Sequence, residues 1–115
     1  MTSLRQAHAR EMASYREARQ RADTAAAWRA LERAHILSQP VLSIHMVTHF
    51  EMLKHAFHTR NGKEIAGQLT RLALAPFGSL TGRIPFGNTG RANVSAFKPM
   101  PIPDDLRVIL ECAES

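Results

Sequence analysis

Apolar positions recur at spacings of three and four along the first 75 residues of the chain. This is the period of a helix with one buried face, and it predicts four helices, over about residues 4–21, 25–38, 40–60 and 63–74. Asp23 and Thr24 are placed to cap the second helix, and Pro40 fits the first turn of the third, where a backbone N–H is not needed. Asn61 and Gly62 predict the end of the third helix, because both residues tolerate a left-handed backbone.

The pattern changes after residue 75, where glycine and proline become frequent. The stretch 76–90 is predicted to be a loop rather than a strand because it contains Pro76, Gly78, Gly82, Pro85, Gly87 and Gly90. Three alternating prolines over residues 99–103 favour an extended, polyproline-like segment. Phe86, Phe97 and Ile102 give this arm apolar side chains with which it can wrap the bundle. Asp104 and Asp105 then place acids at the positive end of a short last helix.

These elements predict an all-α protein with a single domain over residues 1–115. Two helical hairpins form a four-helix core over residues 1–75, a wrapping loop arm covers residues 76–103, and a short helix covers residues 104–113. Residues 23–38 also resemble half of a tetratricopeptide repeat in their spaced Ala, Trp and Leu, so the first hairpin is predicted to be repeat-like.

Composition and charge narrow the class of protein. A chain of 115 residues with 44% hydrophobic and 22% charged residues fits one globular domain and excludes collagen-like or wholly disordered chains. The longest stretch without Asp, Glu, Lys or Arg, residues 34–50, is shorter than the roughly 20 apolar residues of a membrane span, so none is predicted. The first ten residues lack the apolar stretch of a secretion signal, and Cys112 is the single cysteine. A cytoplasmic protein is therefore predicted.

The basic residues do not predict nucleic-acid binding. The net charge is +5, and residues 1–35 hold seven arginines against four acidic residues. Tyr15 is the one aromatic residue among the arginines of the first predicted helix, whereas proteins that bind single strands interleave several aromatic rings with basic side chains. An acidic protein partner, a homodimer and simple solubility all remain compatible with this charge.

A Glu/His cluster on the second and third helices is the candidate functional site. His45 and His49 are four residues apart, so their rings leave one face of the third helix. They are predicted to flank an apolar stripe made of Leu42, Met46, Phe50, Leu53 and Phe57. His35 lies in the middle of the apolar face of the second helix, and Glu32 lies three residues before it. Two adjacent antiparallel helices would present these four side chains to one another.

Three neutral imidazoles and one carboxylate suit a divalent transition metal. Glu32, His35, His45 and His49 are thus predicted as ligands of zinc or iron, with cobalt, nickel and manganese also possible. Two alternatives remain: a structural polar cluster in which Glu32 accepts a hydrogen bond from His35, and acid–base catalysis by the same residues. Since no catalytic arrangement is evident, an enzyme is not predicted.

Other candidate residues are assigned structural positions. His55 and His58 map to the polar face of the third helix and are predicted to be solvated, whereas Met46 and Met52 are predicted to fill the core. His8, on the apolar stripe of the first helix, is at most an accessory ligand.

Four stretches of the chain resemble a bacterial family of uncharacterised function, domain of unknown function 3703. They are residues 31–39, 45–53, 85–90 and 93–103, which read LERAHILSQ, HMVTHFEML, PFGNTG and NVSAFKPMPIP. The resemblance covers about residues 5–110 and implies a small bacterial protein associated with heavy-metal resistance and cation efflux. It brings no activity with it. The predicted function is a cytoplasmic buffer, sensor or handling factor for a divalent transition metal. The alternative is a helical protein-interaction module.

Overall fold

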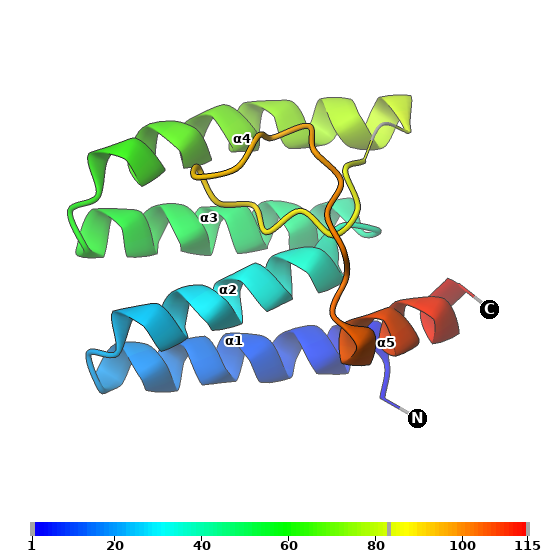
Figure 1. Cartoon of the computed structure of the whole chain (residues 1–115), viewed down its shortest axis with the longest axis horizontal. Helices are drawn as coiled ribbons and strands as arrows, with labels where there is room; N and C mark the ends of the chain where they lie inside the picture. Colours follow the sequence, from blue (N-terminus) through cyan, green and yellow to red (C-terminus); the bar gives the residue numbers. More distant parts are fainter. Residues whose placement is uncertain (1, 83, 115) are drawn as a thin grey trace.

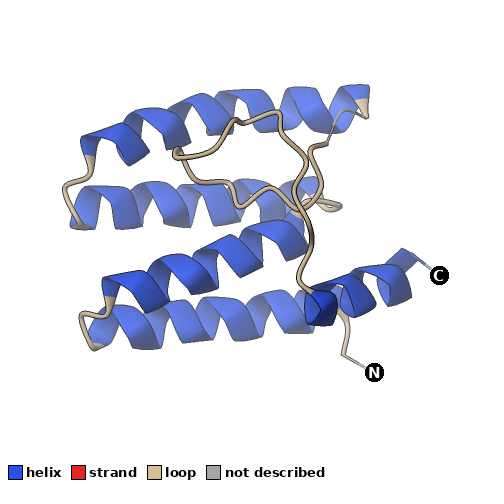
Figure 2. Ribbon diagram, viewed as in Figure 1, coloured by secondary structure: helices blue, strands red, loops and turns tan. Residues whose placement is uncertain are grey.

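The computed structural model describes residues 2–82 and 84–114 of the chain, and these residues form helices and loops without a strand (Figure 2). The helices are α1 (Leu4–Gln20), α2 (Thr24–Ser38), α3 (Leu42–His58), α4 (Gly62–Thr81) and α5 (Asp104–Glu114). As predicted, α1 pairs with α2 and α3 pairs with α4, while α2 contacts α3 and so joins the two hairpins (Figure 1). Among the described residues, no helix is both long enough and apolar enough to cross a membrane.

Side-chain caps begin three of these helices. Ser3 and Gln6 form a capping box at α1, and the Asp23 side chain accepts a hydrogen bond from the backbone N–H of Ala26 at α2. Asn61 caps α4, because its side chain accepts a hydrogen bond from the backbone N–H of Glu64. The left-handed residue between α3 and α4 is Arg60, with φ 55°, rather than Asn61 or Gly62 as predicted.

Two predictions about prolines were wrong. Pro40 lies before α3, whose first residue is Leu42, and is not in the first turn of the helix. Pro76 does not end α4, which continues through it to Thr81. A proline removes one backbone hydrogen bond without forbidding the next turn. Gly82 ends the helix instead: it adopts φ 74° and its N–H donates to the carbonyl of Gly78. The arm therefore begins after Gly82 and not at residue 76.

The face of α3 that is buried also differs from the prediction. Phe50 and Phe57, assigned to the apolar stripe, are 56% and 59% exposed, and of that stripe only Leu53 is buried. The buried face carries His45, Thr48, His49, Met52, His55 and Ala56. Two of its polar side chains have hydrogen-bond partners on other helices: Thr48 contacts His8 of α1, and His49 contacts Gln68 of α4.

The core has two parts. Met12, Tyr15, Trp28, Leu31 and Met52 belong to a cluster between α1, α2 and α3. Leu4, Ile36, Leu37, Leu106 and Leu110 belong to a second cluster, through which α5 docks on α1 and α2.

The arm between α4 and α5 crosses the α3–α4 hairpin and then passes α2 to reach α5, as the yellow and orange trace in Figure 1 shows. Gln39 fixes its start, since the Gln39 side chain donates to the carbonyl of Pro85 and accepts from the N–H of Gly87. The buried Asn88 side chain donates to the carbonyls of Ser95 and Lys98, which closes the arm into a compact loop. The arm is thus held mainly by polar contacts. Of the three apolar side chains predicted to hold it, Ile102 packs against the second core cluster, whereas Phe86 and Phe97 are exposed.

Candidate metal centre

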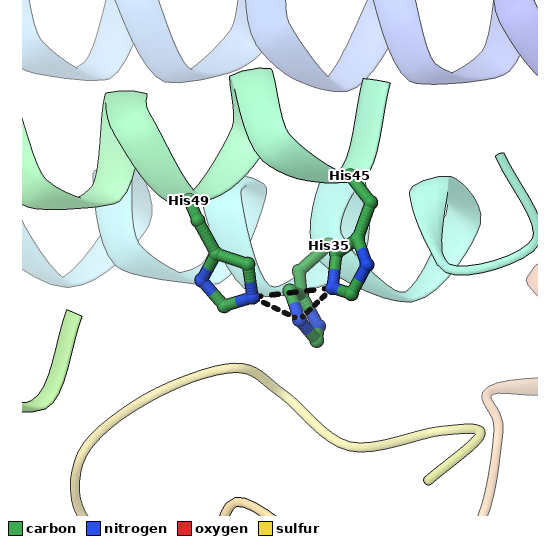
Figure 3. A group of neighbouring side chains, drawn as sticks. All are labelled: His35, His45 and His49. Atoms are coloured by element: carbon green, nitrogen blue, oxygen red, sulfur yellow. Dashed lines mark hydrogen bonds between the residues drawn. The ribbon is translucent and has the colours of Figure 1, made fainter. Parts of the chain in front are cut away.

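Three buried histidines meet beside the arm (Figure 3). His45 and His49 leave α3 one turn apart, and His35 approaches from the last turn of α2. The Nε2 atoms of His35 and His49 are 3.0 Å apart, and the Nε2 atom of His45 is 3.1 Å from each of the other two. The three ring nitrogens thus form a nearly equilateral triangle with one potential ligand atom from each residue.

The hydrogen bonds behind two of the rings fix where their protons are. The Nδ1 atom of His35 lies 2.7 Å from the carbonyl oxygen of Asn88, which can only accept. The Nδ1 atom of His49 lies 2.8 Å from Oε1 of Gln68. The amide of Gln68 cannot be turned around, because its Nε2 donates to Glu64 and to the carbonyl of Gly90. His35 and His49 therefore each carry a proton on Nδ1 and, when neutral, only a lone pair on Nε2.

With Nδ1 protonated on two of the rings, the three Nε2 atoms have too few protons to form a hydrogen bond in each of their three contacts. No proton lies between the Nε2 atoms of neutral His35 and His49, so their 3.0 Å contact sets two lone pairs against each other. A proton on Nε2 of His45 can satisfy only one of its neighbours, and Nδ1 of His45 has no hydrogen-bond partner among the described residues. A single cation at the centre of the triangle would satisfy all three lone pairs at once.

A proton cannot act as the cation at the centre of the triangle at neutral pH, because the pKa values of all three histidines are lowered. Burial, followed by the charges of His49 and His45, lowers the pKa of His35 well below its usual value. Burial lowers the pKa of His45 to about 4, with a further contribution from His49. Burial also lowers the pKa of His49 to about 4, although its hydrogen bond to Gln68 works in the opposite direction. All three rings are therefore neutral near pH 7, which is the state that binds metal.

The same shifts predict that acid destabilises the metal-free protein. Histidines that are neutral in the fold and have a pKa near 6.5 when unfolded stabilise the native state above pH 6.5, and they lose this contribution as the pH falls toward about 4. Between pH 7 and 5.5 the free energy of unfolding should drop by about 1 kcal/mol for each such histidine. Urea unfolding in the presence of a chelator measures the drop.

Three further groups bear on this experiment. Burial lowers the pKa of His55 to about 4 and also lowers the pKa of His8, so both add to the drop, whereas Glu32 opposes it. Burial raises the pKa of the Glu32 carboxyl group, so the Glu32→Gln variant should show an equal or larger drop. A midpoint that does not change between pH 7 and 5.5 in either protein would contradict neutral burial of the histidines.

A polar chain connects the triangle to the arm and α4. Glu64, which is buried, accepts from the Gln68 amide, from Nε of Arg91 at 2.9 Å and from the N–H of Ala92. Arg91 and Ala92 belong to the arm, so the residue that orients His49 is itself held by the segment that covers the site. Such a supporting set of groups is typical of metal-binding histidines. The i,i+4 spacing of Glu64 and Gln68 was visible in the sequence, but nothing there linked either residue to His49.

The structure brings together three of the four predicted ligands. Glu32 is not part of the group formed by the three histidines. Its carboxyl group lies instead near Arg91, whose charge lowers its pKa, and near Glu64, whose charge raises it. Its position on the adjoining edge of α2 turns it toward this ion-pair region and away from the Nε2 triangle.

The other histidines lie elsewhere. Nε2 of His8 is 2.7 Å from Oγ1 of Thr48. His58 is exposed, as predicted, but the prediction that His55 is solvated was wrong, because this side chain is only 1% exposed. Its ring packs edge-on against Tyr15 and Trp28, with ring centroids 5.4 and 4.8 Å away. Relative to the predicted orientation, α3 is rotated about its own axis, so that Phe50 and Phe57 face outward and His55 faces inward.

A cavity of about 240 Å³ adjoins the triangle, with His35, His45 and His49 in its wall. An ion bound to the three nitrogens could therefore take a further ligand from the cavity. Three imidazoles with one free position form the ligand set of many catalytic zinc sites, whereas structural zinc sites are closed by four protein ligands.

Comparison with known proteins identifies a family but no characterised relative. Searches of the curated proteins and of the solved structures gave no significant match. The family model described as protein of unknown function (DUF3703) matches residues 2–110, and we conclude that the chain belongs to this family.

Proposed function

We propose that the protein binds one divalent transition-metal ion through the Nε2 atoms of His35, His45 and His49. The observation that carries the proposal is the fixed pair of Nδ1 protons on His35 and His49, which leaves converging lone pairs. A purely structural polar cluster would be expected to place a proton in each of its short contacts. The proposed cation would accept the lone pairs that no proton satisfies.

Zinc is the metal that fits best. The ligand nitrogens of a tetrahedral zinc ion, with Zn–N bonds of about 2.0–2.1 Å, are roughly 3.3 Å apart. The spacings of 3.0–3.1 Å in this site need only a small expansion to reach that value. Manganese prefers carboxylate oxygens and non-haem iron sites combine two histidines with a carboxylate, but Glu32 is not in the group. Imidazole also binds cobalt and nickel, so these ions can replace zinc in binding experiments. Buffering, sensing and handling of metal all begin with this binding step.

A second candidate function, a helical interaction module, is favoured by apolar side chains on the outer face of the second hairpin. Val47, Phe50 and Phe57 of α3 and Leu69 of α4 are exposed. Metal binding and partner binding would use different faces of α3, so one does not exclude the other.

The experiment is metal analysis of protein purified without a histidine tag, followed by zinc titration against a competing chelator. We expect one zinc ion per chain and the loss of binding when His35, His45 and His49 are all replaced by alanine. A metal-free protein that also fails to bind zinc, cobalt and nickel on titration would overturn the proposal.

Gly90 offers a separate test of the site, because it adopts φ 82° directly against the ring of His35. A Cβ atom at this position would lie 2.6 Å from Cδ2 and 2.9 Å from Nε2 of His35. Gly90→Ala should therefore cost about 2–4 kcal/mol of unfolding free energy, from left-handed strain and overpacking, and should weaken zinc binding by moving the ring.

Gly82→Ala is the matched control for this substitution. Gly82 also has a positive φ, of 74°, but a Cβ atom at this position would have no atom of the described residues within 4 Å. The variant should lose only the backbone contribution, about 1–2 kcal/mol, and bind zinc normally. Urea unfolding and chelator competition measure both quantities, and equal zinc affinities for the two variants would contradict the assignment of His35 as a ligand.

A further inference from the structure

Arg71 is a buried cation that makes no direct ion pair with any of the described residues. The residue is 9% exposed and lies on α4 in the wall of the same cavity as the three histidines. Its two terminal nitrogens donate to the backbone carbonyls of Gly67 and Val94, at 3.2 and 2.6 Å, and these acceptors carry no charge. Its Nε atom has no hydrogen-bond partner in the part of the chain that the structure describes. A buried guanidinium with a free N–H needs a further acceptor.

The nearest acidic group does not supply that acceptor. Glu64 acts on Arg71 through its charge, but one of its oxygens is bound to Arg91 and Ala92 and the other to Gln68. When a divalent cation occupies the Nε2 triangle, the cavity wall holds that ion and the Arg71 guanidinium with no anion between them. Uncompensated charge of one sign is costly in a buried site, so binding of the metal should increase the demand for an anion.

Most of the remaining cavity wall is apolar, although Gln39, Thr81 and Asn88 also line it. The apolar part includes Leu74, Ala75, Ile84, Pro85 and Ala96, and two exposed rings, Phe77 and Phe97, contribute from α4 and the arm. A volume of about 240 Å³ is below the roughly 300–1,000 Å³ of pockets for drug-sized ligands. The cavity therefore suits a small molecule with an anionic head and an apolar body.

We propose that this cavity binds a small apolar carboxylate, with its carboxylate between the free position of the metal ion and the Arg71 guanidinium and its apolar body between α4 and the arm. The proposal rests on the metal site proposed above and names the class of ligand that this site takes. A planar carboxylate matches both partners, because it can coordinate a metal through one oxygen and accept hydrogen bonds from a guanidinium. The apolar wall selects against acetate and inorganic anions, which cannot bury hydrocarbon there.

The experiment measures benzoate binding to the zinc-loaded, untagged protein by calorimetry, after zinc binding itself has been measured. We expect benzoate to bind at one site per chain and at least about tenfold more tightly than acetate, and the uncharged isostere benzamide to show no detectable binding. Benzoate should bind the metal-free protein at least about tenfold more weakly than the zinc-loaded protein.

Arg71→Met keeps much of the apolar stem of the side chain and removes its charge, and we expect it to weaken benzoate binding at least about tenfold. Its zinc affinity should be unchanged or higher, because a nearby positive charge is lost, and this readout shows that the variant is folded. Arg29→Met, at an exposed position of α2, is the matched control and should bind benzoate like the wild type.

The outcomes separate the two proposals. If zinc does not bind, both proposals are wrong. If zinc binds but benzoate does not, or if Arg71→Met binds benzoate as tightly as the wild type, the metal site stands and the carboxylate site is wrong.

Discussion

Replacing His49 with alanine is expected to lower the affinity for zinc by more than about 100-fold. Loss of a group that only supports a ligand typically costs about 10–100-fold in metal affinity, and loss of the ligand itself should cost more. His49 also connects the triangle to Gln68 on α4, so the variant removes one coordinating nitrogen and leaves the Gln68 amide without its donor. Competition with a chelator of known zinc affinity measures the change.

His58→Ala is the control for this variant, because His58 lies on the same helix but is exposed. It should bind zinc like the wild type. Circular dichroism of both metal-free variants separates loss of a ligand from loss of the fold. Equal zinc affinities in His49→Ala and His58→Ala would show that any zinc bound is held elsewhere, for instance by surface histidines.

Zinc is expected to raise the thermal unfolding midpoint of the metal-free protein by about 15 °C at a free zinc concentration 1,000 times the dissociation constant. A ligand that binds only the native state stabilises it by about 4 kcal/mol under these conditions. Each kcal/mol corresponds to roughly 4 °C for a chain of this size. Relief of the opposed lone pairs of His35 and His49 should lower the dissociation constant, and therefore the zinc concentration at which this shift is reached.

The expected shift has two controls. A chelator should reverse it, and the variant with alanine at positions 35, 45 and 49 should show none. A shift of the same size in that variant would mean that zinc stabilises the protein through another site. No shift in the wild type would mean that zinc does not distinguish the native from the unfolded chain.

The helical hairpins and the three histidines could be predicted from the sequence because both depend on local spacing. A period of three to four residues defines the helices, and the four-residue separation of His45 and His49 places their rings on one face. His35 could be added because it lies on the buried face of α2, one short turn away from α3.

The orientation of α3 could not be predicted, because apolar residues occur on more than one side of it. Choosing the side with Phe50 and Phe57 gave the wrong core face and placed His55 in solvent. The observed face depends on partners that are remote in sequence, such as Gln68 on α4, which contacts His49, and His8 on α1, which contacts Thr48. A buried imidazole without a hydrogen-bond partner is costly, and the local sequence pattern does not show which partners the fold will supply.

Glu32 shows the same limit at the level of a single ligand. A spacing of three residues places Glu32 near His35 on the helix surface. Whether its carboxylate meets the metal site or a basic side chain depends on the position of the arm. In the structure the arm brings Arg91 over the ring of Trp28, 4.0 Å from its centroid, and the charge of Arg91 acts on Glu32. The cavity with Arg71 in its wall likewise forms only where α4 and the arm pack together, so it could not be predicted from the sequence.

The most direct test of the metal site is a crystal structure of the zinc-loaded, untagged protein with anomalous diffraction recorded at the zinc absorption edge. We expect one strong anomalous peak per chain, at about 2.0–2.1 Å from each of the three Nε2 atoms of His35, His45 and His49. A peak at any other position, or a triangle with no peak at saturating zinc, would contradict the proposed metal site.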